Sequence, residues 1–337
     1  MDNDAASTHL HPYPWHAEQW QRLCNLRHSE TLPHAYLLKG AQGGGKFRFA
    51  CAFAGYMLCP TPQGDAACGQ CKSCQLYRSG NHPDIKVLQP EEKSKVVKVD
   101  QVRQVIDFAS KTAQQGGYRI IIINPAEAMN SNAANALLKS LEEPGENTLI
   151  LLVTARQNSM LATINSRCQQ LAFPLPDRTE TLDWLSGLSK AGREDLELIL
   201  TLADGQPLTA LQYANDQILK ERARLIEEIG SITKGQNSPV DIAQRWKDQN
   251  TTELLGWVSG WLVDIAKIQQ AGSSAVLNNP DLAAMAGYIA GKSTPQALFA
   301  LQRWVNEQRA LSQGSANLNK QLMLEDLLVR WLHLTLG

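Results

Sequence analysis

The sequence of 337 residues has almost no net charge, because 33 acidic residues balance 32 lysines and arginines and leave −1 at pH 7. The strongly positive field that marks many nucleic-acid-binding proteins is therefore absent, and any contact with DNA has to be local or shared with partners. Long apolar runs are absent too, since the longest fall far short of the ~20 residues that cross a bilayer. The N-terminus carries acids where a secretory signal would be basic, so we expect a cytoplasmic protein without membrane contacts.

The composition excludes disorder for most of the chain. Apolar residues make up 43% and charged residues 19%, a balance typical of a well-buried globular protein. At ~150 residues per domain, the length predicts two domains or three small ones. No internal repeat and no low-complexity segment stands out.

Up to Phe173, short apolar segments alternate with longer amphipathic ones. Apolar strands separated by helices indicate a parallel sheet covered on both faces, which is an α/β domain. The expected strands span residues 35–39, 85–88, 119–123, 148–153 and 169–173, and the expected helices span residues 15–27, 46–58, 101–113 and 132–142.

After Pro174 and Pro176 no convincing strand follows. Asp177 and Glu180 have the spacing of a capping box, which predicts the start of a helix. The remaining pattern predicts a small helical unit over residues 175–216 and a helical bundle over residues 217–337. Four tryptophans lie on the bundle segments, and we interpret them as core residues rather than base-stacking ones: Trp257, Trp261, Trp304 and Trp331.

A glycine-rich loop follows the first expected strand. Gly43, Gly44, Gly45 and Lys46 match a phosphate loop, in which backbone N–H groups curl around phosphates and the lysine reaches the terminal ones. The hydroxyl that should follow the lysine and bind Mg²⁺ is replaced by Phe47, which cannot coordinate a metal. Two interpretations stay open: weak nucleotide binding, and a tight turn kept for packing.

The acidic pair that completes such a site is missing as well. It should end an apolar strand, where one carboxylate holds the metal and the next polarises the attacking water. The strand at residues 119–123 ends instead in Asn124 and Pro125, and Glu127 lies too far along the chain to be assumed a substitute. We therefore expect no ATP hydrolysis by this chain.

Four of the seven cysteines crowd into residues 59–74 with the spacing C-x8-C-x2-C-x2-C. In a reducing compartment, metal binding explains this spacing better than disulfides do. Four thiolates predict a closed, structural Zn²⁺ site, with an iron–sulfur cluster or four free thiols as the alternatives. The expected ligands are Cys59, Cys68, Cys71 and Cys74, whereas Cys24, Cys51 and Cys168 lie in apolar settings and are expected to be buried.

Several short runs are distinctive in combination with the four cysteines. They are Pro33-His34-Ala35, Gly80-Asn81-His82-Pro83-Asp84, Asn135-Ala136-Leu137-Leu138-Lys139-Ser140-Leu141-Glu142-Glu143-Pro144 and Ser166-Arg167-Cys168. Together they resemble the clamp-loader subunits of bacterial DNA polymerase III, which belong to the AAA+ family. The resemblance covers most of the first domain, and the helical remainder carries no comparably sharp motif.

The resemblance implies an AAA+ domain, similar to P-loop NTPases, over residues 1–174, with a zinc module inserted at residues 59–74. It implies a small helical lid over residues 175–216 and a C-terminal helical collar over residues 217–337 that joins subunits. ATPase members of the family carry Ser or Thr at the position of Phe47, an Asp-Glu pair at those of Asn124 and Pro125, and a lid arginine at that of Leu208. A subunit without catalysis of its own, within the polymerase III holoenzyme, is the implied role.

The resemblance also implies a function for Arg167, flanked by Ser166 and Cys168. In the family this arginine reaches the nucleotide on the neighbouring subunit as an arginine finger. The alternative is that Arg167 makes an ion pair within its own chain. The implied partners are ATPase subunits and a delta subunit in a hetero-oligomeric ring, and through the ring a sliding clamp and primed DNA.

Two alternatives remain. The first is an autonomous ATP-hydrolysing subunit of the same family, against which Phe47 and Asn124 argue. The second is a zinc-dependent nucleic-acid-binding module, against which the net charge of −1 argues.

Overall fold

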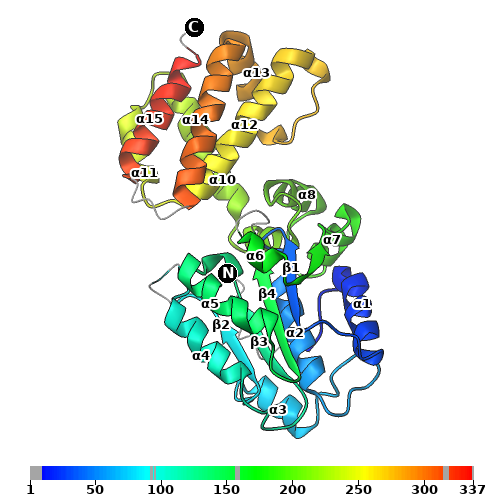
Figure 1. Ribbon diagram of the computed structural model, residues 1–337. Helices are drawn as coiled ribbons and strands as arrows, with labels where there is room; N and C mark the ends of the chain where they lie inside the picture. The colour runs from blue at the N-terminus through cyan, green and yellow to red at the C-terminus, as the bar shows by residue number, and fades with distance from the viewer. Residues whose placement is uncertain (1–9, 92–93, 95, 156–159, 314–318, 336–337) are drawn as a thin grey trace. The chain divides into compact units, whose positions relative to one another are not determined.

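The computed structural model describes residues 10–91, 94, 96–155, 160–313 and 319–335. Its contacts divide the chain into two compact units. The first contains the residues up to Trp184 together with Gly205–Thr209, and the second contains Leu185–Asp204 together with the residues from Ala210 onward. Figure 1 shows a sheet flanked by helices in the first unit and a group of helices in the second.

One five-stranded sheet organises the first unit, with the strand order β2-β3-β4-β1-β5 and every neighbouring pair parallel. The strands are β1 (Ala35–Gly40), β2 (Ile85–Leu88), β3 (Arg119–Ile123), β4 (Thr148–Thr154) and β5 (Gln169–Phe173). All five lie where the apolar segments predict them. The parallel α/β sheet expected from the sequence is confirmed.

Helices cover this sheet and position its loops (Figure 1). They are η1 (Pro14–His16), α1 (Ala17–His28), α2 (Lys46–Leu58), α3 (Lys72–Arg78), α4 (Val99–Ala109), η2 (Ala126–Ala128), α5 (Ser131–Glu142) and α6 (Ala162–Asn165). The expected helices are confirmed to within a few residues at their ends. The helix α3 was not expected, because it is short and its sequence is dominated by the cysteine spacing.

The side chains of β1, β3 and β4 alternate between two apolar clusters, one on each face of the sheet. On one face Leu38 and Ile122 pack in the same cluster as Phe53 of α2. On the other face Leu37 packs in the same cluster as Leu137 of α5. Because both faces are buried, the interiors of β3 and β4 are uninterrupted apolar runs, residues 120–123 and 149–153, instead of alternating with polar residues.

Two helices cross from one unit to the other: α7 (Arg178–Ser186) and α9 (Pro207–Asn215). Asp177 caps α7 by accepting the backbone N–H groups of Thr179 and Glu180 through Oδ1, at 2.8 and 3.2 Å. The second unit contains α8 (Arg193–Leu202), α10 (Ile218–Thr233), α11 (Pro239–Trp246), α12 (Thr251–Ala271), η3 (Gly272–Ser274), η4 (Pro280–Leu282), α13 (Ala283–Lys292), α14 (Pro295–Gln313) and α15 (Lys320–His333).

Tryptophans fill much of the interior of the second unit. Trp257, Trp261 and Trp331 are buried, as the sequence predicts for core residues. Trp304 is half-buried, with the guanidinium carbon of Arg330 5.0 Å from its ring centroid. No described helix combines the length and apolarity needed to cross a membrane.

A buried polar network joins α10 and α12 in this unit. Arg222 is fully buried, and it donates to Asp281 Oδ2 at 2.6 Å and to Asn279 Oδ1 at 2.7 Å. Asp264 accepts the Asn279 backbone N–H at 2.7 Å. A buried charge is tolerated only when its partners are in place, so this network fixes how the helices pack.

Candidate functional site

The phosphate-loop sequence connects β1 to α2, as expected. Gly45 caps the N-terminus of α2 in the left-handed conformation, with φ of +89°, and Gly43 has φ of +76°. A Cβ at Gly43 would lie 2.3 Å from Thr209 Oγ1, and a Cβ at Gly45 would lie 2.4 Å from Tyr13 Cδ2. Glycine is therefore required at both positions by backbone conformation and by packing, without any nucleotide.

The protein's own donors occupy the carbonyl groups of this loop. Lys46 is buried, and its Nζ donates to the Ala41 carbonyl at 2.5 Å. The Trp15 indole N–H donates to the Gly44 carbonyl at 3.0 Å, and the Leu208 backbone N–H donates to the Gly43 carbonyl at 3.0 Å. The loop thus fastens the segment before α1 and the start of α9 to the sheet.

An aromatic cluster packs beside the loop. The rings of Tyr13 and Trp15 stack with centroids 4.7 Å apart, and Trp184 meets both edge-on. His16 lies edge-on to Phe173 at 4.9 Å. Burial lowers the pKa of His16 to about 4, and the positive charges of Lys46 and Arg48 act in the same direction. This histidine is therefore neutral at pH 7.

The positions that would bind metal and activate water carry other side chains. Phe47 is buried and belongs to the apolar cluster beneath α2. Asn124 and Pro125 directly follow β3. The Glu127 carboxylate accepts the Ala155 backbone N–H through Oε1 at 3.0 Å, so it holds the segment that follows β4.

The four clustered cysteines come together at one point, as their spacing predicts. Cys59 follows α2, Cys71 caps α3, and Cys74 lies within α3. The Sγ atoms of Cys59, Cys68, Cys71 and Cys74 all lie within 4.8 Å of one another. Around a Zn²⁺ with Zn–S bonds of about 2.3 Å, tetrahedral geometry separates the sulfurs by about 3.8 Å. The donor set and its spacing fit a structural zinc ion.

Backbone N–H groups support the thiolate form of this cluster. Hydrogen bonds from the N–H groups of Gln70 and Cys71 lower the pKa of the Cys68 thiol to about 6. The N–H of Cys74 donates to Cys71 Sγ at 3.4 Å, which also favours a thiolate there, but burial is the larger effect and raises the pKa of the Cys71 and Cys74 thiols. Thiolates rather than thiols bind metals, so the peptide arrangement matches the chemistry of the site.

The run Gly80 to Asp84 attaches the cysteine module to the sheet, a role that the sequence alone did not reveal. The Asp84 backbone N–H donates to His82 Nδ1 at 3.1 Å, which leaves the proton on Nε2. That nitrogen lies 2.8 Å from Ser73 Oγ, and Ser73 donates to the Leu58 carbonyl at 2.7 Å. The chain of hydrogen bonds joins α3, the end of α2 and the start of β2.

Arg167 lies just after α6, on the surface of the first unit. Its Nε donates to Glu142 Oε1 at 2.7 Å, and its Nη2 lies 2.5 Å from the same oxygen. Nη1 donates to the Thr163 carbonyl at 3.0 Å. The side chain is 34% exposed, so the guanidinium remains accessible although it is hydrogen-bonded.

The neighbours of this arginine have different surroundings. Ser166 is exposed, and its hydroxyl donates to the Thr163 carbonyl at 3.1 Å. Cys168 is buried in the apolar cluster that includes α5, and burial raises the pKa of its thiol to about 12. Cys168 therefore anchors the segment. Cys24 and Cys51 are buried as well, in the cluster on the other face of the sheet.

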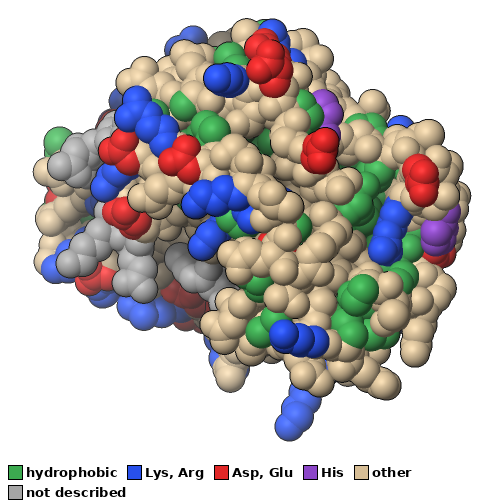
Figure 2. Space-filling model, turned by 60° about the horizontal axis from the view of Figure 1, so that its bottom comes forward, with side chains coloured by type: hydrophobic (Ala, Val, Ile, Leu, Met, Phe, Trp, Pro, Cys, Tyr) green, Lys and Arg blue, Asp and Glu red, His purple; other side chains and the backbone are tan. Residues whose placement is uncertain are grey.

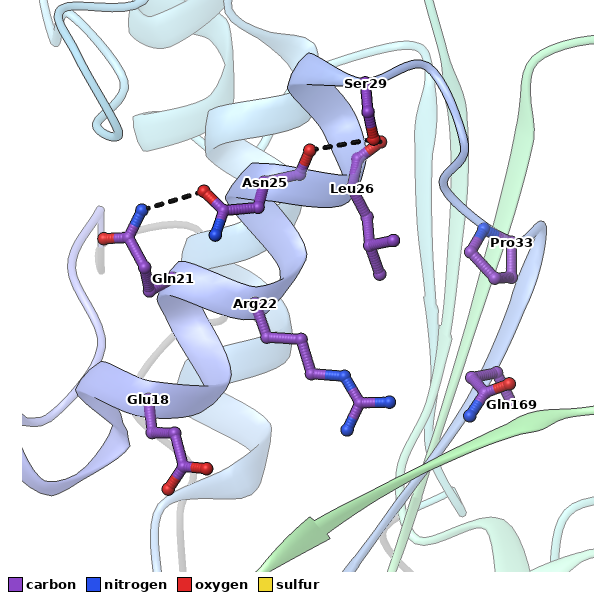
Figure 3. A pocket seen from close by; sticks show the side chains of 8 residues that line it. All are labelled: Glu18, Gln21, Arg22, Asn25, Leu26, Ser29, Pro33 and Gln169. Atoms are coloured by element: carbon purple, nitrogen blue, oxygen red, sulfur yellow. Dashed lines mark hydrogen bonds between the residues drawn. The ribbon is translucent and has the colours of Figure 1, made fainter.

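Two further surface features are a groove beside α1 and the distribution of charged side chains. A groove beside α1 is lined by Glu18, Arg22, Asn25 and Gln169 among others, with Gln21 donating to Asn25 Oδ1 at 3.1 Å (Figure 3). Of the residues singled out from the sequence, Pro33 lines it, and the cysteine cluster, the phosphate loop and Arg167 do not. On the face in Figure 2, Lys and Arg side chains are interspersed with Asp and Glu, so that face has no uniformly basic surface for DNA.

Comparisons with known proteins cover nearly the whole chain. Residues 15–177 match the family model described as DNA polymerase III, delta subunit, and residues 216–333 match the C-terminal model of that subunit. A DNA polymerase III subunit delta' of Pseudomonas aeruginosa is 40% identical over 321 residues, which are 95% of this chain and 97% of that protein. The subunit delta' of Escherichia coli K12 is 29% identical over 322 residues, with 95% of each chain covered. A crystal structure of a DNA polymerase III gamma subunit-related protein from Thermotoga maritima aligns with 94% of this chain and 99% of that one, at 19% identity and a TM-score of 0.45.

Proposed function

The chain belongs to the family of DNA polymerase III delta' subunits, and from that premise we propose that it is a structural, non-hydrolysing subunit of the clamp loader. In this role it helps to place a sliding clamp on primed DNA during replication. The observation that carries the proposal is the contrast between a phosphate loop that is followed by the buried Phe47 and has no carboxylate after β3, and an accessible arginine elsewhere on the same unit.

The absence of ATP hydrolysis rests on three positions. Phe47 places a buried ring where a metal-binding hydroxyl belongs, and Asn124 and Pro125 supply no carboxylate after β3. Leu208 stands where ATPase relatives carry a lid arginine, and its backbone N–H bonds the loop itself. The groups that would bind the metal ion and position the attacking water are therefore missing, whereas Lys46 and the glycine run remain, with Lys46 donating to the Ala41 carbonyl.

Arg167 serves the nucleotide on the neighbouring ATPase subunit, as an arginine finger acting in trans. A planar guanidinium offsets the charge that develops on the transferring phosphoryl group, an effect of ~10³- to 10⁵-fold where such fingers have been dissected. Its place at the surface after α6 supports this role, since a buried arginine could not reach another subunit. Ser166 and Cys168 hold the segment, the first at the surface and the second in the core.

Cys59, Cys68, Cys71 and Cys74 hold one Zn²⁺ whose function is structural. The ion supplies a closed cross-link with no position for substrate, so it contributes to folding rather than to chemistry. Ser73 and His82 connect this module to the sheet. Loss of the metal should therefore weaken the AAA+ unit as a whole.

The partners follow from this assignment. They are the ATPase subunits and the delta subunit of the ring, with the sliding clamp and primed DNA contacted through the complex. We retain the division into an AAA+ domain (1–174), a lid (175–216) and a collar (217–337), in which the collar is the main oligomerisation element. Exposed apolar side chains on its helices support an interface there, for example Tyr288, Phe299 and Leu322.

The experiment is reconstitution of the clamp loader with wild-type or Arg167→Ala chains, followed by clamp loading on primed DNA. We expect normal assembly, because the side chain lies at the surface, but slower loading. Arg103→Ala is the matched control, since Arg103 is an exposed arginine on α4 that is also ion-paired, with Asp100. Wild-type loading by the Arg167→Ala complex would contradict the proposal.

A further inference from the structure

The carboxylate of Glu142 holds one edge of the Arg167 guanidinium. One oxygen, Oε1, accepts from Nε at 2.7 Å and lies 2.5 Å from Nη2. On the other side Nη1 donates to the Thr163 carbonyl at 3.0 Å and lies 3.3 Å from Ser166 Oγ. Contacts at both ends of a rigid, planar fork fix its plane as well as its position.

The location of Glu142 does not suggest a role in stabilising its own helix. It is the last residue of α5, where the helix dipole disfavours a carboxylate. Its side chain is 51% exposed, so it is not a packing element either. Its described partner is the arginine after α6, 25 positions along the chain.

An arginine finger needs such a support. A free arginine samples many rotamers, and each has to be excluded before its N–H groups meet a phosphoryl group. The contacts to Glu142 and Thr163 leave the second N–H of Nη2 for a phosphoryl oxygen. The arginine can therefore be oriented before assembly and still have an N–H group available for the phosphoryl group.

We infer that Glu142 is a positioning residue for Arg167: it orients the guanidinium toward the nucleotide of the neighbouring subunit. This inference rests on the proposed function of Arg167. It assigns to the first glutamate of the Leu-Glu-Glu-Pro run a task that the second, Glu143, does not share. Glu143 is exposed and has no ion pair with any residue that the structure describes.

The test uses full-length chains in the reconstituted clamp loader, with Glu142→Gln against Glu143→Gln. Both variants remove one negative charge at neighbouring exposed positions, so they separate orientation from a general electrostatic effect. We measure kcat and KM for ATP in the presence of clamp and primed DNA, together with the melting temperature of each free chain. Glu142→Asp, which keeps the charge on a shorter side chain, serves as a second variant.

We expect Glu142→Gln to reduce kcat almost as much as Arg167→Ala does. The KM for ATP and the melting temperature should remain nearly unchanged. Glu142→Asp should recover part of that loss, and Glu143→Gln should have no effect. In a chain that already carries Arg167→Ala, Glu142→Gln should cause no further loss.

Three results would overturn the inference. A wild-type kcat for Glu142→Gln together with a reduced kcat for Arg167→Ala would support the arginine finger and show that Glu142 does not position it. A kcat above wild type would mean that Glu142 masks the arginine rather than orienting it. An equal loss of kcat from Glu142→Gln in chains with and without Arg167 would show that Glu142 acts independently of the arginine. A wild-type kcat for Arg167→Ala would instead reject the proposed arginine finger itself.

Discussion

Arg167 and Glu142 form an ion pair at the surface of the sheet-containing unit, with Nη2 2.5 Å from Oε1. The two residues come from different elements, the segment after α6 and the end of α5. Exposed ion pairs of this kind contribute little to stability, because water and salt screen both charges. We therefore expect the pair to orient the arginine rather than to stabilise the fold.

The first prediction follows from this exposure. Arg167→Ala should lower the free energy of unfolding of the isolated chain by less than about 1 kcal/mol, since the arginine and the glutamate are 34% and 51% exposed. Urea denaturation of both chains measures the difference. A loss above about 3 kcal/mol would favour a purely internal role for Arg167, of the kind seen when a buried pair is broken.

The second prediction concerns the cysteine cluster. Purified protein should contain one Zn²⁺ per chain by elemental analysis, and Cys71→Ser should lose the metal and unfold at a lower temperature, because structural zinc contributes folding free energy. Cys168→Ala, which alters a cysteine outside the cluster, should keep its zinc. Purified wild-type chain without zinc, or a Cys71→Ser chain that retains both metal and stability, would reject the site.

The third prediction separates packing from nucleotide binding in the glycine run. Gly45→Ala should destabilise the chain by about 1–3 kcal/mol, because the residue is left-handed and its Cβ would meet Tyr13. Gly44→Ala is the control, since its Cβ would find only the Ala41 carbonyl at 3.5 Å. Chemical denaturation in the absence of nucleotide should distinguish the two, and equal stabilities would refute the packing role.

The fourth prediction is a loss of stability in mild acid. Burial lowers the pKa of His16 from 6.5 to about 4. The unfolded chain takes up this proton near pH 6.5 and the folded chain does not, so stability is complete above pH 6.5 and falls as the pH decreases toward 4. From that shift, His16 should cost about 2 kcal/mol of stability between pH 7 and pH 5.

Denaturation at the two pH values with His16→Phe as the comparison measures this contribution. Phenylalanine keeps a ring among Phe49 and Phe173 but has no titrating group. Burial also lowers the pKa of His82, and this second contribution is common to both chains. The same pH dependence with and without His16 would contradict the assignment.

Local patterns predicted most of the fold, and contacts between distant segments account for what they missed. The strands were evident because both sides of β3 and β4 are buried, which leaves uninterrupted apolar runs. The cysteine site was evident because its ligands lie within 16 consecutive residues, 59–74. The position of helix α9 was not predicted, since it begins at Pro207 directly after a glycine-containing turn.

The supporting contacts of the candidate site were not predictable in the same way. Glu142 and Arg167 are far apart in the sequence, and neither carries a local sign of its partner. Likewise, Trp15 and Leu208 donate to carbonyl groups of the phosphate loop from outside it, so the glycine run by itself did not reveal these contacts. Such pairings arise from tertiary packing, which a single sequence does not record.

The central claim is that this chain assists ATP hydrolysis on a neighbouring subunit without hydrolysing ATP itself. The most direct test is steady-state ATP turnover by the reconstituted clamp loader, with clamp and primed DNA present, carrying either Arg167→Ala or Lys46→Met. Methionine preserves the buried stem of Lys46 and removes the ammonium group that a working phosphate loop requires. We predict slower turnover for Arg167→Ala and unchanged turnover for Lys46→Met, whereas unchanged turnover for the first and a loss for the second would contradict the account.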